Sequence, residues 1–269
     1  MLHHDSDSLI ERAVPYTYRE VRASYGGAKA AQEQHDVMFR FFARPLSFPV
    51  AWLALSLGLT PNHVTYVSLL LNLLGLGLMA SGDRVLMAWG VVIILFALVL
   101  DAADGNMART AKRFSPVGEW LEGVGSYVLC SGFHVAGGVG AWLALRRGDP
   151  VTAWPDASDG AWLVLLGAVA AGAITLSILV AAKFSIVFPQ VDRRQVVARL
   201  GGGFYGLLFT LGRNLSFASG LVLPFTLAGI LGRRYELVLG GFALLNTGML
   251  LVVTARCLLL ARRASGPAQ

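Results

Sequence analysis

Six apolar runs dominate the sequence, and each is near or above the roughly 20 residues that a helix needs to cross a bilayer. They cover residues 62–82, 84–108, 117–145, 160–187, 204–231 and 235–261. Backbone polar groups inside a bilayer have no water to bond, so runs of this kind form helices. Of the 269 residues, 55% are hydrophobic and 14% are charged, which leaves too little polar surface for a soluble protein of this length. We therefore predict an all-α polytopic membrane protein with six transmembrane helices, preceded by an interfacial amphipathic helix.

The basic residues that flank the runs predict the orientation. With the N-terminus in the cytosol, sixteen of the 22 Lys and Arg residues lie on the inner side and five on the outer side. The outer five are Arg84, Arg146, Arg147, Arg233 and Arg234. Cytoplasmic loops carry the excess of Lys and Arg, so we expect both termini, and the turn between the second and third runs, on the cytosolic side of a cytoplasmic membrane. The net charge of +6 fits contact with anionic lipid headgroups, whereas the hydrophobicity argues against a nucleic-acid partner.

The segment before the first run mixes arginines with aromatic residues and prolines. Arg40 and Arg44 are four residues apart, which is typical of a helix lying in the interface with its arginines among lipid phosphates. Pro45, Pro49 and Pro61 are expected to break this segment into short pieces. The predicted divisions are a cytosolic arm over residues 1–34, interfacial helices over 35–60, a six-helix transmembrane domain over 61–263 and a cytosolic tail over 264–269.

Ionisable residues lie at the end of the second run, in the stretch "DAADGNMARTAKRFSPVGEWLEGVGS" at residues 101–126. Asp101, Asp104 and Ala108 are spaced i, i+3 and i+7, so they share one face of a helix. Gly105 and Ala108 have small side chains, so a ligand can approach the backbone closely on that face. Because ionisable groups at membrane depth are costly, they usually line a functional cavity.

A second set of residues follows across the turn. Gly118, Glu122 and Ser126 recur every four residues and share a face, and Glu119 points partly the same way. Packing the second and third helices against each other would gather three or four carboxylates beside Arg109, Lys112 and Arg113. A hard cation such as Mg²⁺ neutralises such a cluster and bridges carboxylates to substrate phosphates, which suggests a metal-assisted reaction on a phosphate ester. In the alternative interpretation, Asp101 and Asp104 only cap the helix and pair with Arg109 or Arg113.

The same stretch resembles the signature of the CDP-alcohol phosphotransferases. That signature reads D-x-x-D-G-x-x-A-R, eight residues, G, three residues, D, three residues, D. The matching positions are Asp101, Asp104, Gly105, Ala108, Arg109 and Gly118. The stretch "GLTPNHVTYVSLLLNLLGL" is also similar to the family's approach to its first span, so the resemblance covers roughly residues 35–262.

The resemblance implies a homodimer in which each protomer has a cytosol-facing cavity. Such enzymes bind a CDP-linked donor and one or two Mg²⁺ or Mn²⁺ ions, pass a phosphoryl-linked group to an alcohol acceptor and release CMP. By this resemblance, Asp101 and Asp104 are metal ligands, joined by Glu122 at the third aspartate position. Gly105, Ala108 and Gly118 make room for the cytidine diphosphate, and Arg109 holds this region.

The last two positions depart from the family pattern. Glu122 keeps a carboxylate at the third position, but Ser126 replaces the aspartate that is the family's general base. A serine hydroxyl holds its proton too tightly to act as a base at neutral pH. Either the base has moved to Glu122 or Glu119, or the reaction needs none, or transferase activity is lost.

The sequence singles out two further residues and leaves two alternative functions open. Arg213, inside a predicted span, either contacts a substrate phosphate, as Arg113 could, or marks the true start of the fifth span. His134 is more typical of a packed, hydrogen-bonded histidine than of a catalyst. The rival functions are a repurposed or silent relative with another phosphate substrate, and a small cation transporter that uses the carboxylates.

Overall fold

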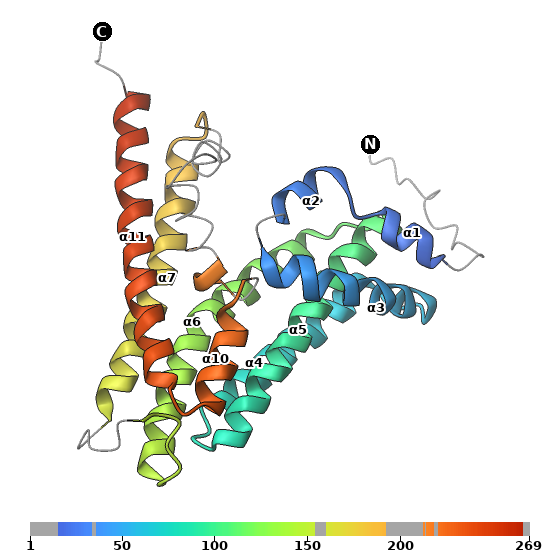
Figure 1. Ribbon diagram of the computed structural model, residues 1–269. Helices are drawn as coiled ribbons and strands as arrows, with labels where there is room; N and C mark the ends of the chain where they lie inside the picture. Colours follow the sequence, from blue (N-terminus) through green and yellow to red (C-terminus); the bar gives the residue numbers. More distant parts are fainter. Residues whose placement is uncertain are drawn as a thin grey trace.

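Helices account for all the regular structure in the part of the chain that the computed structural model describes. That part comprises residues 16–33, 36–153, 160–191, 212, 214–217 and 220–265. The elements are α1 (Tyr18–Ala23), α2 (Gly27–Glu33), the π-helix η2 (Phe39–Ala43), α3 (Arg44–Ser56), α4 (Pro61–Met79), α5 (Arg84–Ala111), α6 (Pro116–Arg146), α7 (Ala161–Val187), α10 (Val222–Leu231) and α11 (Tyr235–Ser265), as Figure 1 shows. The predicted all-α class is confirmed.

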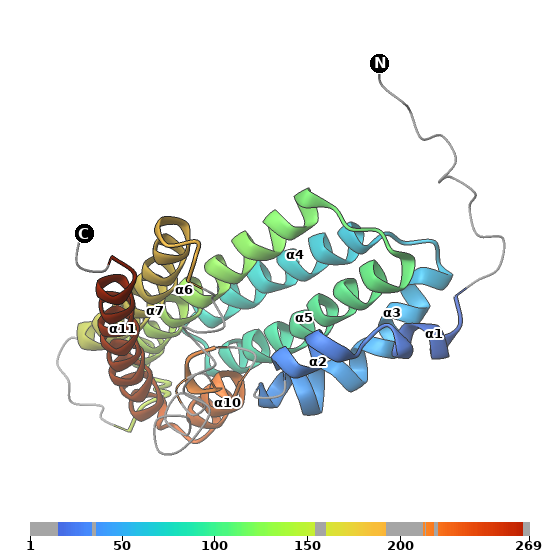
Figure 2. The same cartoon turned by 90° about the horizontal axis from the view of Figure 1, so that it is seen from above.

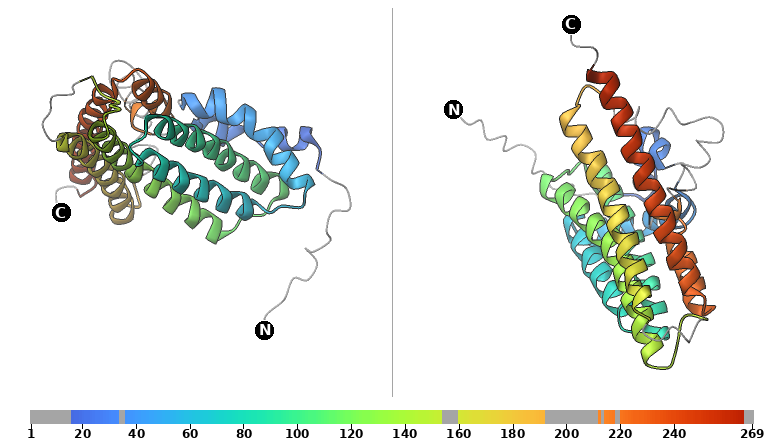
Figure 3. Two further views of the ribbon diagram at one scale, coloured as in Figure 1. Left: turned by 90° about the horizontal axis from the view of Figure 1, so that it is seen from below. Right: turned by 90° about the vertical axis from the view of Figure 1, so that its left-hand side faces the viewer.

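Five of these helices are long and apolar enough to cross a membrane, namely α4, α5, α6, α7 and α11. The predicted fifth span, at 204–231, is represented by α10, which has only 10 residues. Residues 204–211 lie outside the described part of the chain, so the predicted count of six spans is not confirmed. Figure 3 shows α7 and α11 running side by side along the bundle.

Capping residues fix where the spans begin. The Thr60 side chain accepts a bond from the His63 backbone N–H, and Pro61 occupies the first turn of α4. Asp83 caps α5 in the same way, and the Ser115 hydroxyl accepts from Gly118 N–H at the start of α6. Such caps satisfy backbone donors that lack a partner within the helix. The turn between α5 and α6 covers only residues 112–115, so the C-terminal end of α5 and the N-terminal end of α6 lie close in space.

Helix α4 packs between α5 and α6, and it contacts both far more than they contact each other. Figure 2 shows these three helices running side by side, with α4 in the middle. Small residues allow the closest approach, since a Cβ added at Gly90 would lie 2.6 Å from the Gly75 carbonyl oxygen. The expectation that the second and third helices pack directly against each other is therefore wrong over most of their length. They come together at one cavity, near the C-terminal end of α5 and the N-terminal end of α6.

The N-terminal segments pack on the outside of α5 (Figure 1). Val21 of α1 is fully buried, and the Trp52 indole N–H donates to the Tyr16 carbonyl at 3.1 Å. The expectation that prolines break residues 35–60 is wrong for Pro45 and Pro49, which both lie within α3. Pro45 sits in the first turn, where a missing N–H costs little, and only Pro61 begins a new helix.

Helix η2 contains a five-residue turn directly before α3. The Arg44 backbone N–H donates to the Phe39 carbonyl, five residues earlier rather than four. Arg40 lies within this turn and Arg44 directly follows it, and the two arginines differ in exposure: Arg40 is exposed, whereas Arg44 is buried.

Candidate active site

A cavity of about 230 Å³ lies where the end of α5, the start of α6 and the N-terminal helices meet. Its walls carry Lys29, Glu33, Asp36, Phe39, Arg44, Asp101, Asp104, Gly105, Arg109 and Glu122. The structure thus brings the three predicted metal ligands, Asp101, Asp104 and Glu122, to one cavity. Gly105 and Arg109, predicted to contact substrate, lie on the same walls.

Asp104 is held by a residue that sequence reasoning missed. Its carboxylate is 7% exposed, and Oδ2 accepts a 2.6 Å hydrogen bond from the Thr65 hydroxyl of α4. The Thr65 hydroxyl also lies 3.1 Å from the Pro61 carbonyl, but it has one proton to donate, and the bond to a carboxylate is the stronger. The available signal was a hydroxyl in an otherwise apolar run, since a buried hydroxyl needs a partner.

The carboxylates of this cavity are oxygen donors of the kind that a divalent cation prefers. Within the described ranges, no three His, Cys, Asp or Glu side chains are close enough together to hold one ion. Mg²⁺, however, keeps several waters and commonly takes one or two protein carboxylates together with substrate phosphates. Asp101 and Asp104, one turn apart on α5, provide oxygen donors of that kind, and Glu122 adds a third on the α6 side of the cavity. The residues present fit such a group, with room for oxygen ligands from a substrate.

Arg109 is fixed by a buried amide. Its Nη2 donates to Asn106 Oδ1 at 2.6 Å, while the Asn106 side-chain N–H donates to the Ser47 hydroxyl at 2.8 Å. The guanidinium lies over Gly105, where an added Cβ would be 3.3 Å from Nη1. The bare face at Gly105 is therefore covered by Arg109. Asn106 was not predicted as part of the site, although it lies between two motif residues.

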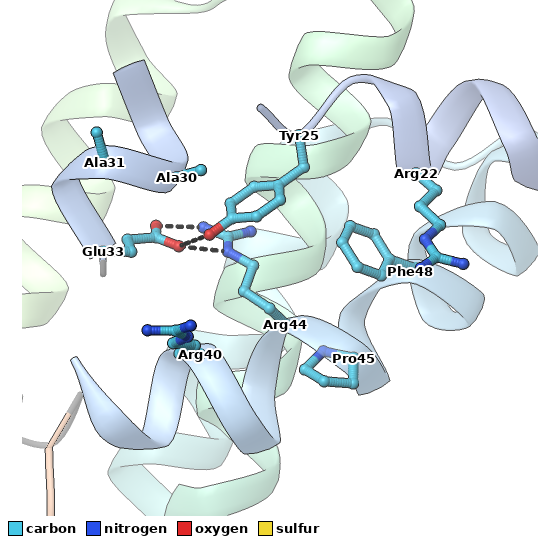
Figure 4. Close-up of a pocket in the computed structure, with 9 residues that line it drawn as sticks. All are labelled: Arg22, Tyr25, Ala30, Ala31, Glu33, Arg40, Arg44, Pro45 and Phe48. Atoms are coloured by element: carbon cyan, nitrogen blue, oxygen red, sulfur yellow. Dashed lines mark hydrogen bonds and ion pairs between the residues drawn. The ribbon is translucent and has the colours of Figure 1, made fainter. Parts of the chain in front are cut away.

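Arg44 connects the N-terminal helices to α5. Its Nε and Nη2 donate to the two Glu33 carboxylate oxygens at 2.7 and 2.6 Å, and its Nη1 donates to the Ala102 carbonyl at 2.8 Å and to Asn106 Oδ1 at 3.0 Å. Figure 4 shows the paired bonds to Glu33. Both side chains are 5% exposed. The expectation that Arg44 lies among lipid phosphates is wrong, because its charge is used on a buried protein carboxylate.

The electrostatics of this pair follow from its burial. Burial alone would raise the pKa of the Glu33 carboxyl, but the bonds to Arg44 and the nearby Lys29 outweigh it and hold that pKa below its ordinary value. Lys29 Nζ lies 3.2 Å from Glu33 Oε1. Glu33 is thus kept as a carboxylate at the wall of the cavity.

Several predicted residues lie away from the cavity. Glu119 and Ser126 are exposed and are not part of its walls, and neither is half-buried Ala108. Gly118 packs against α4, since a Cβ there would meet Asn62 Oδ1 at 2.8 Å. Arg113 is exposed beyond the end of α5. Arg213 lies outside the described residues.

His134 has a packing role deep in the bundle, as expected. It is 1% exposed, and its Nε2 lies 3.2 Å from the Asn246 side-chain nitrogen, which also donates to the Ala170 carbonyl. These bonds join α6, α7 and α11, and polar side chains commonly form such bonds between membrane helices.

Comparison with known proteins places these features in a family. The sequence matches the family described as CDP-alcohol phosphatidyltransferase over residues 58–228, which include α4, α5, α6 and all the carboxylates of the motif. No curated protein matches the chain. Since the family match covers more than half of the 269 residues, the chain belongs to the CDP-alcohol phosphatidyltransferase family.

Proposed function

We propose that this protein transfers a phosphate-linked group from a CDP-alcohol donor to an alcohol acceptor and releases CMP. The observation that carries the proposal is the cavity where Asp101, Asp104 and Glu122 share walls with Arg109. The acceptor oxygen would attack the phosphorus that carries the donor's alcohol. The bond from that phosphorus to the bridging oxygen would break, and CMP would leave with the electron pair.

Members of this family use divalent metal ions. Asp101 and Asp104 would hold Mg²⁺ or Mn²⁺, with Glu122 as a further ligand, and the ion would neutralise the diphosphate and polarise its P–O bonds. Thr65 would hold the Asp104 carboxylate in place through its 2.6 Å bond. Arg109, fixed by Asn106, would contact diphosphate oxygens through its planar fork.

We place the general base at Glu122. Of the three candidates, Glu122, Glu119 and Ser126, only Glu122 lies on the cavity wall. A carboxylate can take the acceptor's proton, whereas a serine hydroxyl cannot do so at neutral pH. Glu122 would then serve the acceptor side, and Asp101 and Asp104 would carry most of the metal binding.

CMP release from CDP-linked donors, measured with a panel of alcohols, tests the placement of the base. Glu122→Gln should lose about 10²- to 10⁴-fold in rate, the usual contribution of a positioned acid or base. Glu119→Gln is the matched control, because it removes a carboxylate from the same helix but away from the cavity, and it should stay close to wild type. Equal losses in both variants, or full activity in Glu122→Gln, would refute the assignment.

The metal site has its own test, which does not need activity. Added Mg²⁺ or Mn²⁺ should raise the melting temperature of the wild type, because an ion that binds only the folded state stabilises it. Asp101→Asn should remove this response. The same rise in the variant as in the wild type would rule out Asp101 as a ligand.

Ser126 supports a second candidate function, a relative with the same fold that acts on another phosphate or diphosphate substrate. In that case neither the wild type nor Ser126→Asp would release CMP from any CDP-linked donor, although the metal response would persist. If the base were only lost, Ser126→Asp would instead restore activity.

The charge distribution along the chain and its family membership support a proposal for orientation and oligomeric state. Both termini and the cavity would face the cytosol, in a cytoplasmic membrane, and the enzyme would act as a homodimer. Size-exclusion chromatography with light scattering in detergent tests the dimer, and cysteine labelling at residues 112 and 147 from either side of the membrane tests the orientation.

A further inference from the structure

A second cavity, of about 560 Å³, lies between the N-terminal helices and α3. Its walls comprise Arg22, Tyr25, Ala30, Ala31, Glu33, Arg40, Arg44, Pro45 and Phe48, which Figure 4 draws. It shares only Glu33 and Arg44 with the active-site cavity, so their ion pair forms a wall between the two. The volume falls in the range of about 300–1,000 Å³ that is usual for small-molecule sites.

The charges on this cavity do not balance. Three arginines face a single carboxylate, Glu33, which is already bonded by Arg44 and by Lys29. Arg22 and Arg40 are exposed, and neither forms an ion pair with any residue that the structure describes. Two guanidinium groups are therefore left to attract an anion.

The two arginines come from different elements and border the cavity on different sides. Arg22 belongs to α1 and Arg40 to η2, and Figure 4 shows Tyr25, Arg44 and Phe48 between them. The rings of Tyr25 and Phe48 are paired edge to face, with centroids 5.9 Å apart. A ligand here would meet guanidinium groups at its edges and aromatic surface between them.

Exposed apolar residues follow two of the lining residues in the chain. Phe41 is 70% exposed, with the Arg40 guanidinium carbon 5.2 Å from its ring centroid, and Leu46 follows at 45% exposed. Phe41 follows Arg40 in the chain and Leu46 follows Pro45, and both Arg40 and Pro45 line the cavity. Apolar residues at the acyl boundary beside arginines at the phosphate level are typical of helices that lie in the membrane interface. This combination suits an amphiphile better than a free anion.

We propose that this second cavity binds the phosphate headgroup of an anionic phospholipid. Arg22 and Arg40 contact the phosphate and headgroup oxygens, for which the planar guanidinium is well suited. Phe41 and Leu46 lie along the first carbons of the acyl chains. The site is separate from the catalytic cavity and does not depend on the proposed reaction.

The experiment titrates purified protein in a neutral detergent at about 0.15 M salt and counts bound ligand by native mass spectrometry. Three ligands are compared: short-chain phosphatidylglycerol, short-chain phosphatidylcholine and inorganic phosphate. We expect saturable binding of phosphatidylglycerol, weaker binding of phosphatidylcholine and weaker binding still of inorganic phosphate. Each of Arg22→Gln and Arg40→Gln should weaken phosphatidylglycerol binding about tenfold, since hydrogen bonds between charged groups are worth about that factor.

Arg19→Gln is the matched control. It removes the same charge from the same helix, three residues before Arg22, at an exposed position that does not line the cavity. Its affinity should stay within about twofold of wild type, because screening weakens exposed charges at this salt concentration. All three variants should keep the wild-type melting temperature in the absence of lipid.

Each outcome decides the proposal. Wild-type affinity in the double variant Arg22→Gln, Arg40→Gln would overturn it. An equal loss in Arg19→Gln would also overturn it, since binding would then follow overall charge rather than this cavity. Inorganic phosphate that binds as tightly as phosphatidylglycerol, with the same dependence on Arg22 and Arg40, would overturn the lipid assignment in favour of a soluble phosphate.

Discussion

Replacing Arg44 by Met should destabilise the protein, because the buried Glu33 carboxylate then loses its main ion-pair partner. The substitution keeps most of the apolar stem but removes two bonds to Glu33, one to the Ala102 carbonyl and one to Asn106. Removing one partner of a buried ion pair costs about 3–5 kcal/mol. Lys29 stays 3.2 Å from Glu33, so the lower end, about 3 kcal/mol, applies. For a chain of this size the melting temperature should fall by about 6–12 °C.

Thermal unfolding in detergent, followed by circular dichroism, measures this loss. Arg40→Met is the matched control, one helical turn earlier and exposed, and should change the unfolding free energy by no more than about 0.5 kcal/mol. The double variant Glu33→Leu, Arg44→Met should be more stable than Arg44→Met alone, because it leaves no buried charge unpaired. A double variant as unstable as the sum of both single changes would refute the reasoning, since the cost would then come from lost packing.

Two further predictions concern the neighbouring carboxylates. Thr65→Val removes the bond to Asp104, so the Mg²⁺ concentration that gives half of the melting-temperature rise should increase about tenfold. Thr65→Ser keeps the hydroxyl and should stay close to wild type. An unchanged midpoint in Thr65→Val would show that the bond does not position a ligand. Folding lowers the pKa of the Glu33 carboxyl, so its ion pair stabilises the folded state at pH values above the unfolded-state pKa. This stabilisation is lost as the pH falls through the pKa of Glu33 in the folded state. The stability gap between wild type and Arg44→Met should therefore shrink on acidification from neutral pH to about pH 3, and a constant gap in denaturant titrations would contradict the pKa assignment.

Helical periodicity was enough to predict the arrangement of Asp101 and Asp104. Residues three apart share a face, so both carboxylates had to point the same way, and a membrane span had to turn that face toward a cavity. The all-α class, predicted from the apolar runs, and the family, predicted from the resemblance of the motif, are confirmed. The roles of the individual site residues stay predictions.

Helical periodicity does not predict which neighbouring helix a given face packs against. The wrong predictions about helix packing and the missed site residues have this cause. The sequence order places α5 beside α6, but close packing at Gly75 and Gly90 binds α5 to α4, and this brings Thr65 to Asp104. Glu33 was missed for the same reason. In the sequence, Glu33 is one of several charged residues in a polar segment. Only the tertiary structure places it against Arg44.

The π turn in η2 has a consequence for how the two cavities are divided. A five-residue turn adds one residue to the helix, and each residue of an α-helix rotates the chain by about 100°. The extra residue therefore changes the rotational phase of the residues before the turn relative to those of α3 after it. The buried residues of α3, Arg44, Ser47, Ala51 and Ala54, begin directly after this turn, whereas Arg40 inside the turn is exposed. We infer that a chain shortened by one residue between Phe39 and Ala43 would rotate α3 relative to the segment before it, and would displace Arg44 from the wall that the two cavities share.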